Sequence, residues 1–279
     1  SAVQGHDAGT LAARVLADAD VLAAVQAGDL PGAREAIRAA TGRLGQFTGL
    51  QGRAGMTYQF SPEQHHGPAD DTIFVFTQVA EFPFLGDSST ATSVAYQRIY
   101  DRYFAPLGEH RGVKVLAVFT HGPGIIFTVK QPVTSAADAG KLKFRIGGGN
   151  INELSKLMGW NTTLKPATDS FELLSTGVMD GTFFPDESLQ SMRLNMVKYA
   201  TTFPGGLYNT SFVFMMNQAK YNALSAQDKA VVDKLSGEPA ARLFGEGWDK
   251  LDAASRENQK AQGVQRVMAD KAFVKAVAD

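Results

Sequence analysis

An arginine at the end of a short apolar run is well suited to hold an anion. Arg145 lies between Phe144 and Ile146 and directly precedes three glycines. A guanidinium can donate two parallel hydrogen bonds to one carboxylate, which lysine cannot reproduce. The apolar neighbours indicate a position near the interior. The sequence therefore favours a carboxylate-binding role for Arg145, with an ion pair inside the protein or a surface position as the alternatives.

The glycines that follow Arg145 separate a predicted strand from a helix that is expected to be capped by Asn150. Backbone amides at a helix N-terminus can bind an anion, and Gly148 is predicted to contact the ligand on this ground. The segment lacks both the GxGxxG pattern and a P-loop lysine, so it does not favour a nucleotide site. The alternative is a tight turn that allows close backbone approach beside Arg145.

Aromatic residues stand near the predicted ends of strands. Phe183 and Phe184 end a buried run before Pro185, and open α/β sheets bind ligands beyond the carboxyl ends of their strands. Because side chains alternate along a strand, one of the two rings should face a cleft and the other the core. Phe82 and Tyr208 are also predicted to line the cleft, although core packing is the commoner fate of such rings.

Evidence for catalysis or metal binding is weak. Glu187 could accept a hydrogen bond from a ligand hydroxyl, or it could be a solvated carboxylate at a helix start. His65 and His66, with Asp70 and Asp71, match no established zinc spacing, so no metal site is predicted. The sequence has no cysteine, no Gly-x-Ser-x-Gly motif and no evident acid–base pair of carboxylates. These observations favour binding over turnover and predict no cofactor.

Composition sets the broad class of protein. The chain has 279 residues, is 44% hydrophobic and carries a net charge of −1. It can bury a substantial core, and its charge favours neither nucleic acid nor an anionic membrane as a partner. No apolar run approaches the ~20 residues of a membrane span.

Strand-like and helix-like segments alternate along the sequence. Strands are predicted at 72–79, 112–119, 125–129, 141–146, 178–184 and 207–216. Helices are predicted at 11–45, 88–107, 150–158 and 171–174, and from 219 almost to the end. This alternation predicts an α/β fold with mostly parallel strands flanked by helices.

Several motifs occur in an order that resembles a known family. Residues 138–145 read Asp-Ala-Gly-Lys-Leu-Lys-Phe-Arg, and residues 171–181 read Phe-Glu-Leu-Leu-Ser-Thr-Gly-Val-Met-Asp-Gly. Together with residues 82–84 (Phe-Pro-Phe) and the pair Met216-Asn217, they are similar to the solute-binding subunits of TRAP transporters, the DctP-like family. The resemblance covers roughly residues 71–265.

The resemblance implies a two-lobed periplasmic binding protein that delivers its ligand to membrane permease subunits. One lobe would contain 1–122 and part of 207–279. The other would contain 123–206 and part of the C-terminal helices. The chain would cross between the lobes near Gly122-Pro123-Gly124 and again near residues 204–206. The family signature supports Arg145 as the residue that binds the ligand carboxylate.

Departures from the family pattern bear on the ligand. Ile125 stands where many members carry a second arginine, and Phe183-Phe184 stand where many carry Glu-Asn. These replacements predict a monocarboxylate with an apolar or aromatic body rather than a dicarboxylate or a sugar acid. Two alternatives remain: an α/β enzyme that acts on a carboxylate anchored by Arg145, and a binding protein of an ABC importer.

Overall fold

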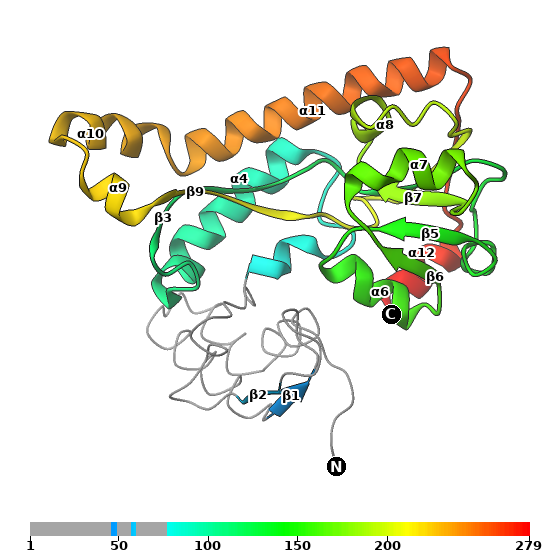
Figure 1. Cartoon of the computed structure of the whole chain (residues 1–279), viewed down its shortest axis with the longest axis horizontal. Coiled ribbons are helices and arrows are strands. Elements are labelled where there is room, and N and C mark those ends of the chain that lie inside the picture. The colour runs from blue at the N-terminus through cyan, green and yellow to red at the C-terminus, as the bar shows by residue number, and fades with distance from the viewer. Residues whose placement is uncertain (1–45, 49–56, 60–76) are drawn as a thin grey trace.

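A six-stranded sheet forms the larger part of the described fold (Figure 1). The computed structural model describes residues 46–48, 57–59 and 77–279. The strand order is β10 (Gln265–Met268), β8 (Tyr199–Thr202), β4 (Ile125–Thr128), β7 (Gly181–Phe184), β5 (Lys143–Ile146) and β6 (Asn161–Leu164). Strand β4 is antiparallel to both neighbours, and the other pairings are parallel. The predicted α/β fold with a largely parallel sheet is confirmed.

A smaller sheet pairs β3 (Val113–Thr120) with β9 (Ser211–Asn217) in antiparallel fashion. Helices α4 (Ser89–Ile99) and α11 (Glu238–Ala261) pack against each other beside it. Strands β1 (Gln46–Thr48) and β2 (Thr57–Gln59) form a separate antiparallel pair. Residues 11–45, predicted to be helical, lie outside the described residues.

Shorter elements connect these strands and helices. They are the 3₁₀ helices η1 (Thr77–Glu81), η3 (Ala105–Leu107) and η4 (Ala167–Asp169), the π-helical turn η2 (Tyr100–Phe104), and the helices α5 (Ala136–Ala139), α6 (Asn150–Leu157), α7 (Ser170–Ser175), α8 (Ser188–Ser191), α9 (Gln218–Asn222), α10 (Ala226–Leu235) and α12 (Lys271–Ala278). No helix in the described part of the chain is both long and apolar enough to cross a membrane.

Two clusters of buried apolar side chains stabilise the larger sheet. Phe144 and Phe183 belong to one cluster, and Phe127 and Phe184 belong to the other. Consecutive residues of β7 thus point into different clusters, as strand alternation requires. The two faces of this sheet are therefore covered by separate apolar layers.

The chain passes between the two sheets at both predicted glycine-containing segments. Residues 121–124 connect β3 to β4, and residues 203–210 connect β8 to β9. The two connections are bonded to each other, because Gly124 N donates to Tyr208 O (2.9 Å) and Leu207 N donates to Gly124 O (2.8 Å). Helix α11 extends from the smaller sheet to the level of α8 beside the larger one (Figure 1).

Several sequence predictions differ from the structure, and the region from residue 219 that was predicted to be helical contains the strand β10. The predicted strand at 72–79 is wrong at its end, because residues 77–79 belong to the 3₁₀ helix η1. Tertiary bonds hold this helix: the Thr77 amide donates to the buried Glu109 carboxylate (3.2 Å). The predicted cap of α6 is also shifted by one residue, since Gly149 is the N-cap and Asn150 begins the helix.

Candidate functional site

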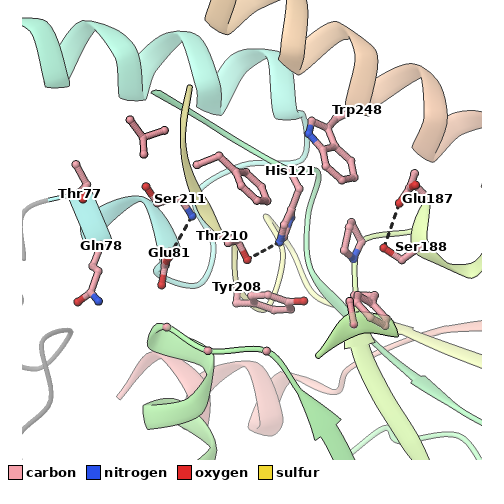
Figure 2. A pocket seen from close by; sticks show the side chains of 18 of the residues that line it. Thr77, Gln78, Glu81, His121, Glu187, Ser188, Tyr208, Thr210, Ser211 and Trp248 are labelled. Carbon is pink, nitrogen blue, oxygen red and sulfur yellow. Dashed lines mark hydrogen bonds between the residues drawn. The ribbon is translucent and has the colours of Figure 1, made fainter. Parts of the chain in front are cut away.

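A cavity of about 630 Å³ lies between the larger sheet, the smaller sheet and α11. Its lining residues come from distant parts of the sequence, as Figure 2 shows. They are Thr77, Gln78, Glu81, His110, His121, Arg145, Gly147, Gly148, Gly149, Ala167, Phe184, Pro185, Glu187, Ser188, Ser191, Met192, Tyr208, Thr210, Ser211, Phe212, Val213 and Trp248.

Arg145 lies at the carboxyl end of β5 and is 4% exposed. Its Nε donates to Lys165 O (2.9 Å), and its guanidinium carbon lies 4.6 Å from the centre of the Phe184 ring. Burial lowers the pKa of Arg145, yet a guanidinium remains protonated at neutral pH. No ion pair joins Arg145 to a carboxylate within the described residues. Within the described part of the chain, Arg145 is thus a buried cation that forms no ion pair with a carboxylate, and the carboxylate charge that acts on its pKa is that of Asp169.

The two phenylalanines of β7 occupy opposite faces of the sheet. Phe184 lines the cavity beneath Arg145 and is 7% exposed. Phe183 lies in the core, with its ring centre 5.0 Å from that of Phe144 and 5.7 Å from that of Trp160. Ile125 pairs with Phe184 across β4 and β7, and it too is packed in the core rather than on the cavity.

The glycine turn lines the cavity, but the amide at the start of α6 already binds a carboxylate of the chain itself. Asn150 N donates to Glu81 Oε2 (3.0 Å), and Ser211 N donates to Glu81 Oε1 (3.1 Å). Gly149 has φ +82°, and a Cβ there would lie 2.1 Å from Glu81 Oε2. Gly148 is a lining residue, while Gly149 provides the space that the Glu81 carboxylate occupies.

Tyr208 lies at the crossing between the sheets and lines the cavity. Its ring packs onto Gly124, where a Cβ would lie 2.2 Å from Tyr208 Cε1. Burial raises the pKa of Tyr208, so the hydroxyl stays protonated and can donate. This hydroxyl has no hydrogen-bond partner among the described residues, which leaves it available to a ligand.

His121 is a buried, neutral member of the cavity wall. Its Nδ1 bonds to Gly122 O, and its Nε2 lies 2.9 Å from Thr210 Oγ1. Since a carbonyl oxygen can only accept, Nδ1 is the protonated nitrogen and Nε2 accepts from the hydroxyl. Burial lowers the pKa of His121 to about 4. The His121 ring centre lies 5.4 Å from that of Tyr208 and 6.0 Å from that of Trp248, so the three form one aromatic wall.

Of the two other residues that were predicted to contact the ligand, Glu187 lines the cavity and Phe82 does not. Glu187 lines the cavity, and its Oε2 accepts from Ser188 Oγ (3.1 Å). The Glu187 amide donates to Asp252 Oδ1 (2.7 Å), which ties the start of α8 to α11. Phe82 is half-buried and does not line the cavity.

The sequence interpretation missed Glu81, His121 and Trp248. Glu81 directly precedes the Phe-Pro-Phe element, and that proximity is the one local signal that could have marked it. His121 and Trp248 lie in segments that resemble an ordinary strand end and an ordinary helix. No group of three or more His, Cys, Asp or Glu side chains in the described residues could hold a metal ion. The pair His65 and His66 lies outside those residues.

Solved structures with the same fold are known with bound aromatic acids. A TRAP periplasmic solute-binding protein from Bordetella bronchiseptica, with bound (R)- and (S)-mandelate, is 41% identical, with a TM-score of 0.70; the match covers 76% of this chain and 67% of that one. A TRAP solute-binding protein from a marine metagenome, specific for aromatic acid ligands and in complex with metahydroxyphenylacetate, is 33% identical, with a TM-score of 0.67; the match covers 72% of this chain and 64% of that one.

Sequence comparisons agree with the structural ones. The outer membrane transporter protein TsaT of Comamonas testosteroni is 29% identical over 214 residues, which are 76% of this chain and 63% of TsaT. The chain therefore matches less than two thirds of the length of TsaT. The family model of bacterial extracellular solute-binding proteins of family 7, DctP, matches residues 71–278. As its motifs predict, this chain belongs to the DctP family of bacterial extracellular solute-binding proteins.

Proposed function

We propose that the protein captures an aromatic monocarboxylate in this cavity without transforming it. The observation that carries the proposal is Arg145, a cation 4% exposed with no carboxylate partner among the described residues. A buried charge is costly unless it is paired and hydrogen-bonded. A ligand carboxylate would provide that pair, and the protonated Tyr208 hydroxyl could donate to it as well.

The aromatic body is supported by the rings that line the cavity. Phe184, Tyr208, Phe212 and Trp248 all contribute to its wall. Aromatic surface favours an apolar body by ~25 cal/mol per Å² buried, and by ~0.5–1.5 kcal/mol more where rings pair well. Neutral His121 adds a further uncharged ring. The aromatic acids bound by the two solved relatives are consistent with this class of ligand.

A single carboxylate is supported by the charges of the lining. Arg145 is the one Lys or Arg side chain among the described lining residues, and Glu81 and Glu187 line the same cavity. A second ligand carboxylate would find no second Lys or Arg side chain among the lining residues that the structure describes. The ligand class is therefore a monoacid in preference to a dicarboxylate.

The two sheets support a two-lobed arrangement around the ligand. We assign 1–122 and part of 207–279 to one lobe, and 123–206 and part of the C-terminal helices to the other. Arg145 and Phe184 would bind from one lobe, whereas Tyr208 lies at the crossing and Trp248 on α11. The loaded protein would act in the periplasm and deliver its ligand to membrane permease subunits of a TRAP transporter, as the family membership suggests.

A thermal-shift screen against organic acids tests the proposal. At a ligand concentration of ~100 times Kd, binding adds about 2.7 kcal/mol, which should raise Tm by about 5–10 °C. Benzoate, mandelate and hydroxyphenylacetate should shift Tm, and succinate and galacturonate should not. NMR of the ligand after incubation separates binding from catalysis, because an enzyme would convert it. Conversion of the acid, or tightest binding of a dicarboxylate or sugar acid, would contradict the proposal.

A further inference from the structure

The position of Glu187 at the cavity is fixed by its backbone rather than by its side chain. The Glu187 amide donates to Asp252 Oδ1 on α11 (2.7 Å), and the Glu187 side chain makes no capping bond to α8. Asp252 is 2% exposed, so this tie is anchored in the interior. Figure 2 shows Glu187 and Ser188 at the end of the cavity away from Thr77 and Gln78. A change of the Glu187 side chain should therefore leave the tie between α8 and α11 intact.

The carboxylate of Glu187 has acceptor capacity to spare. Within the part of the chain that the structure describes, its one hydrogen-bond donor is the Ser188 hydroxyl, at 3.1 Å from Oε2. No lysine, arginine or histidine of that part forms an ion pair with it. An ionised carboxylate has about four acceptor positions. Glu187 thus provides a charged acceptor at the cavity wall with room for a further donor.

The wall around Glu187 is largely apolar. Phe184, Pro185 and Met192 line the cavity from the same stretch of chain, and Trp248 lines it from α11. An apolar ring placed against a carboxylate removes part of its hydration without replacing it, which costs free energy. A ring that carries a hydroxyl replaces the lost water with a charge-assisted hydrogen bond. The Glu187 carboxylate therefore favours a ligand with a donor at this end.

Phe184 relates the Glu187 position to that of Arg145. The Arg145 guanidinium carbon lies 4.6 Å from the centre of the Phe184 ring, and Glu187 follows Phe184 by three residues. The segment between them turns tightly, because Ser188 N donates to Pro185 O (3.2 Å). An acid whose carboxylate pairs with Arg145 and whose ring packs on Phe184 would extend towards Glu187.

We infer that Glu187 is a specificity-determining residue that selects aromatic monoacids with a hydrogen-bond donor, such as a phenolic hydroxyl, on the ring. The inference rests on the proposed function and adds to it a subsite for a donor, separate from the site of the ligand carboxylate at Arg145.

Pairs of acids that differ in one donor test the inference. They are meta- and para-hydroxybenzoate, each compared with the fluorobenzoate of the same isomer, since fluorine lacks the proton. The measured quantity is the ratio Kd(fluorobenzoate)/Kd(hydroxybenzoate), obtained by calorimetry on protein shown to be folded by its melting transition. In the wild type this ratio should be about tenfold or more for at least one isomer, as expected for a hydrogen bond to a charged acceptor.

Substitution of Glu187 should remove this preference. In Glu187→Ala the ratio for the preferred isomer should fall to within about threefold of unity, because the acceptor is gone. Glu187→Gln keeps the length of the side chain and loses the charge, so its ratio should fall at least about threefold; this variant is the test if Glu187→Ala does not fold.

Glu257→Ala is the matched control. It removes an exposed carboxylate of α11 that does not line the cavity, and its ratio should stay within about twofold of the wild type. An equal fall in Glu257→Ala would show that the effect comes from net charge and would overturn the inference.

The other outcomes separate the inference from the proposed function. A wild-type ratio near unity for both isomers, or an unchanged ratio in the folded Glu187 variant, would overturn the inference, whereas binding of benzoate by the wild type would still uphold the proposed function. A wild-type protein that bound neither benzoate nor its hydroxylated forms would overturn both.

Discussion

At the scale of single residues, Arg145 should dominate ligand affinity. Removing one partner of a buried charge pair costs ~3–5 kcal/mol, which is a loss of several hundred-fold or more in affinity. Arg145→Ala is therefore expected to abolish measurable benzoate binding in calorimetry. Arg145→Lys should also bind poorly, because an ammonium lacks the planar fork of donors.

The control for Arg145 is an exposed arginine. Arg242 is paired with Glu238 on the surface of α11, and its side chain is 48% exposed. Arg242→Ala removes the same charge and should leave benzoate affinity within about twofold of the wild type. Near-native affinity in Arg145→Ala would remove the main support for the proposed binding mode.

Asp252 should make stability depend on pH. This α11 carboxyl is 2% exposed and lies against Gly122, where a Cβ would be 1.8 Å from its Oδ2. The pKa of Asp252 is raised to about 7, mainly by burial; the hydrogen bond from the Glu187 amide lowers the pKa in part, and the neighbouring Asp186 charge raises it. The folded state therefore binds a proton that the unfolded state releases between roughly pH 4 and pH 7. The contribution of this proton to stability is present at low pH and is lost as the pH rises through 7.

Asp252→Asn tests this linkage, because the amide oxygen can still accept from the Glu187 amide. The variant should match the wild type in free energy of unfolding only below about pH 4, where the carboxyl is protonated in both the folded and the unfolded state. At pH 8 it should be more stable by an amount on the order of a few kcal/mol. His121, whose pKa is lowered to about 4, gives the opposite slope below pH 6.5 in both proteins and cancels in the difference. Urea titrations at the two pH values give the measurement, and a constant difference would refute the assignment.

At the scale of elements, the contact between α4 and α11 depends on a glycine. A Cβ at Gly245 would lie 2.6 Å from Thr90 Cα, so the two helix backbones are in close contact there. Asp249, one turn later, accepts from Ser89 N (2.7 Å) and Thr90 N (3.0 Å) at the start of α4. Gly245→Ala should therefore destabilise the fold by ~1–3 kcal/mol, measured by urea unfolding.

Gly247 is the natural control for that change. It lies in the same helix, and nothing stands within 4 Å of a Cβ built there. Gly247→Ala should stabilise the protein by ~0.5–1 kcal/mol through helix propensity alone. Equal effects of the two substitutions would show that close packing at Gly245 is not the cause.

Elements with a strong apolar pattern were predictable from sequence, and short strands with a polar sequence were not. The strand at 112–119 and the helix at 88–107 correspond closely to β3 and to α4 with its extensions. Strands β6 (Asn-Thr-Thr-Leu), β8 (Tyr-Ala-Thr-Thr) and β10 (Gln-Arg-Val-Met) were missed, because they contain few large apolar residues, whereas the equally short β4 and β7 are rich in them. Strand β10 also pairs on one side only, so much of its surface is exposed.

At the scale of the whole molecule, the site is assembled by tertiary structure. Arg145 and Phe184 could be found from sequence because each ends a recognisable strand. Glu81 and His121 could not, since their roles depend on partners that are distant in the chain, such as Asn150 and Thr210. Contacts of this kind leave no periodic or local signal in a single sequence.

Ligand binding should change the shape of the molecule. The cavity is lined from both sheets, and the chain crosses between them at residues 121–124 and 203–210. Gly206, at the second crossing, has φ +86° and lies against Pro123 of the first, so small rotations at this bonded pair of segments would separate the two walls. The hydrogen bond from Asn150 N to Glu81 Oε2 joins the two cavity walls next to the glycine turn at residues 147–149. This bond should form as the two walls approach each other.

Small-angle scattering tests this closure. Without ligand, Arg145 has no anion to draw the opposite wall towards it, so open forms should be populated in solution. Saturating benzoate should lower the radius of gyration, because closure buries the ligand and strengthens its pairing with Arg145 in a medium of lower dielectric. Arg145→Ala, measured at the same benzoate concentration, should show no compaction. An unchanged radius of gyration in the wild type, with full occupancy verified by calorimetry, would mean that the ligand enters a cavity that is already closed, and the crossings would then not act as hinges.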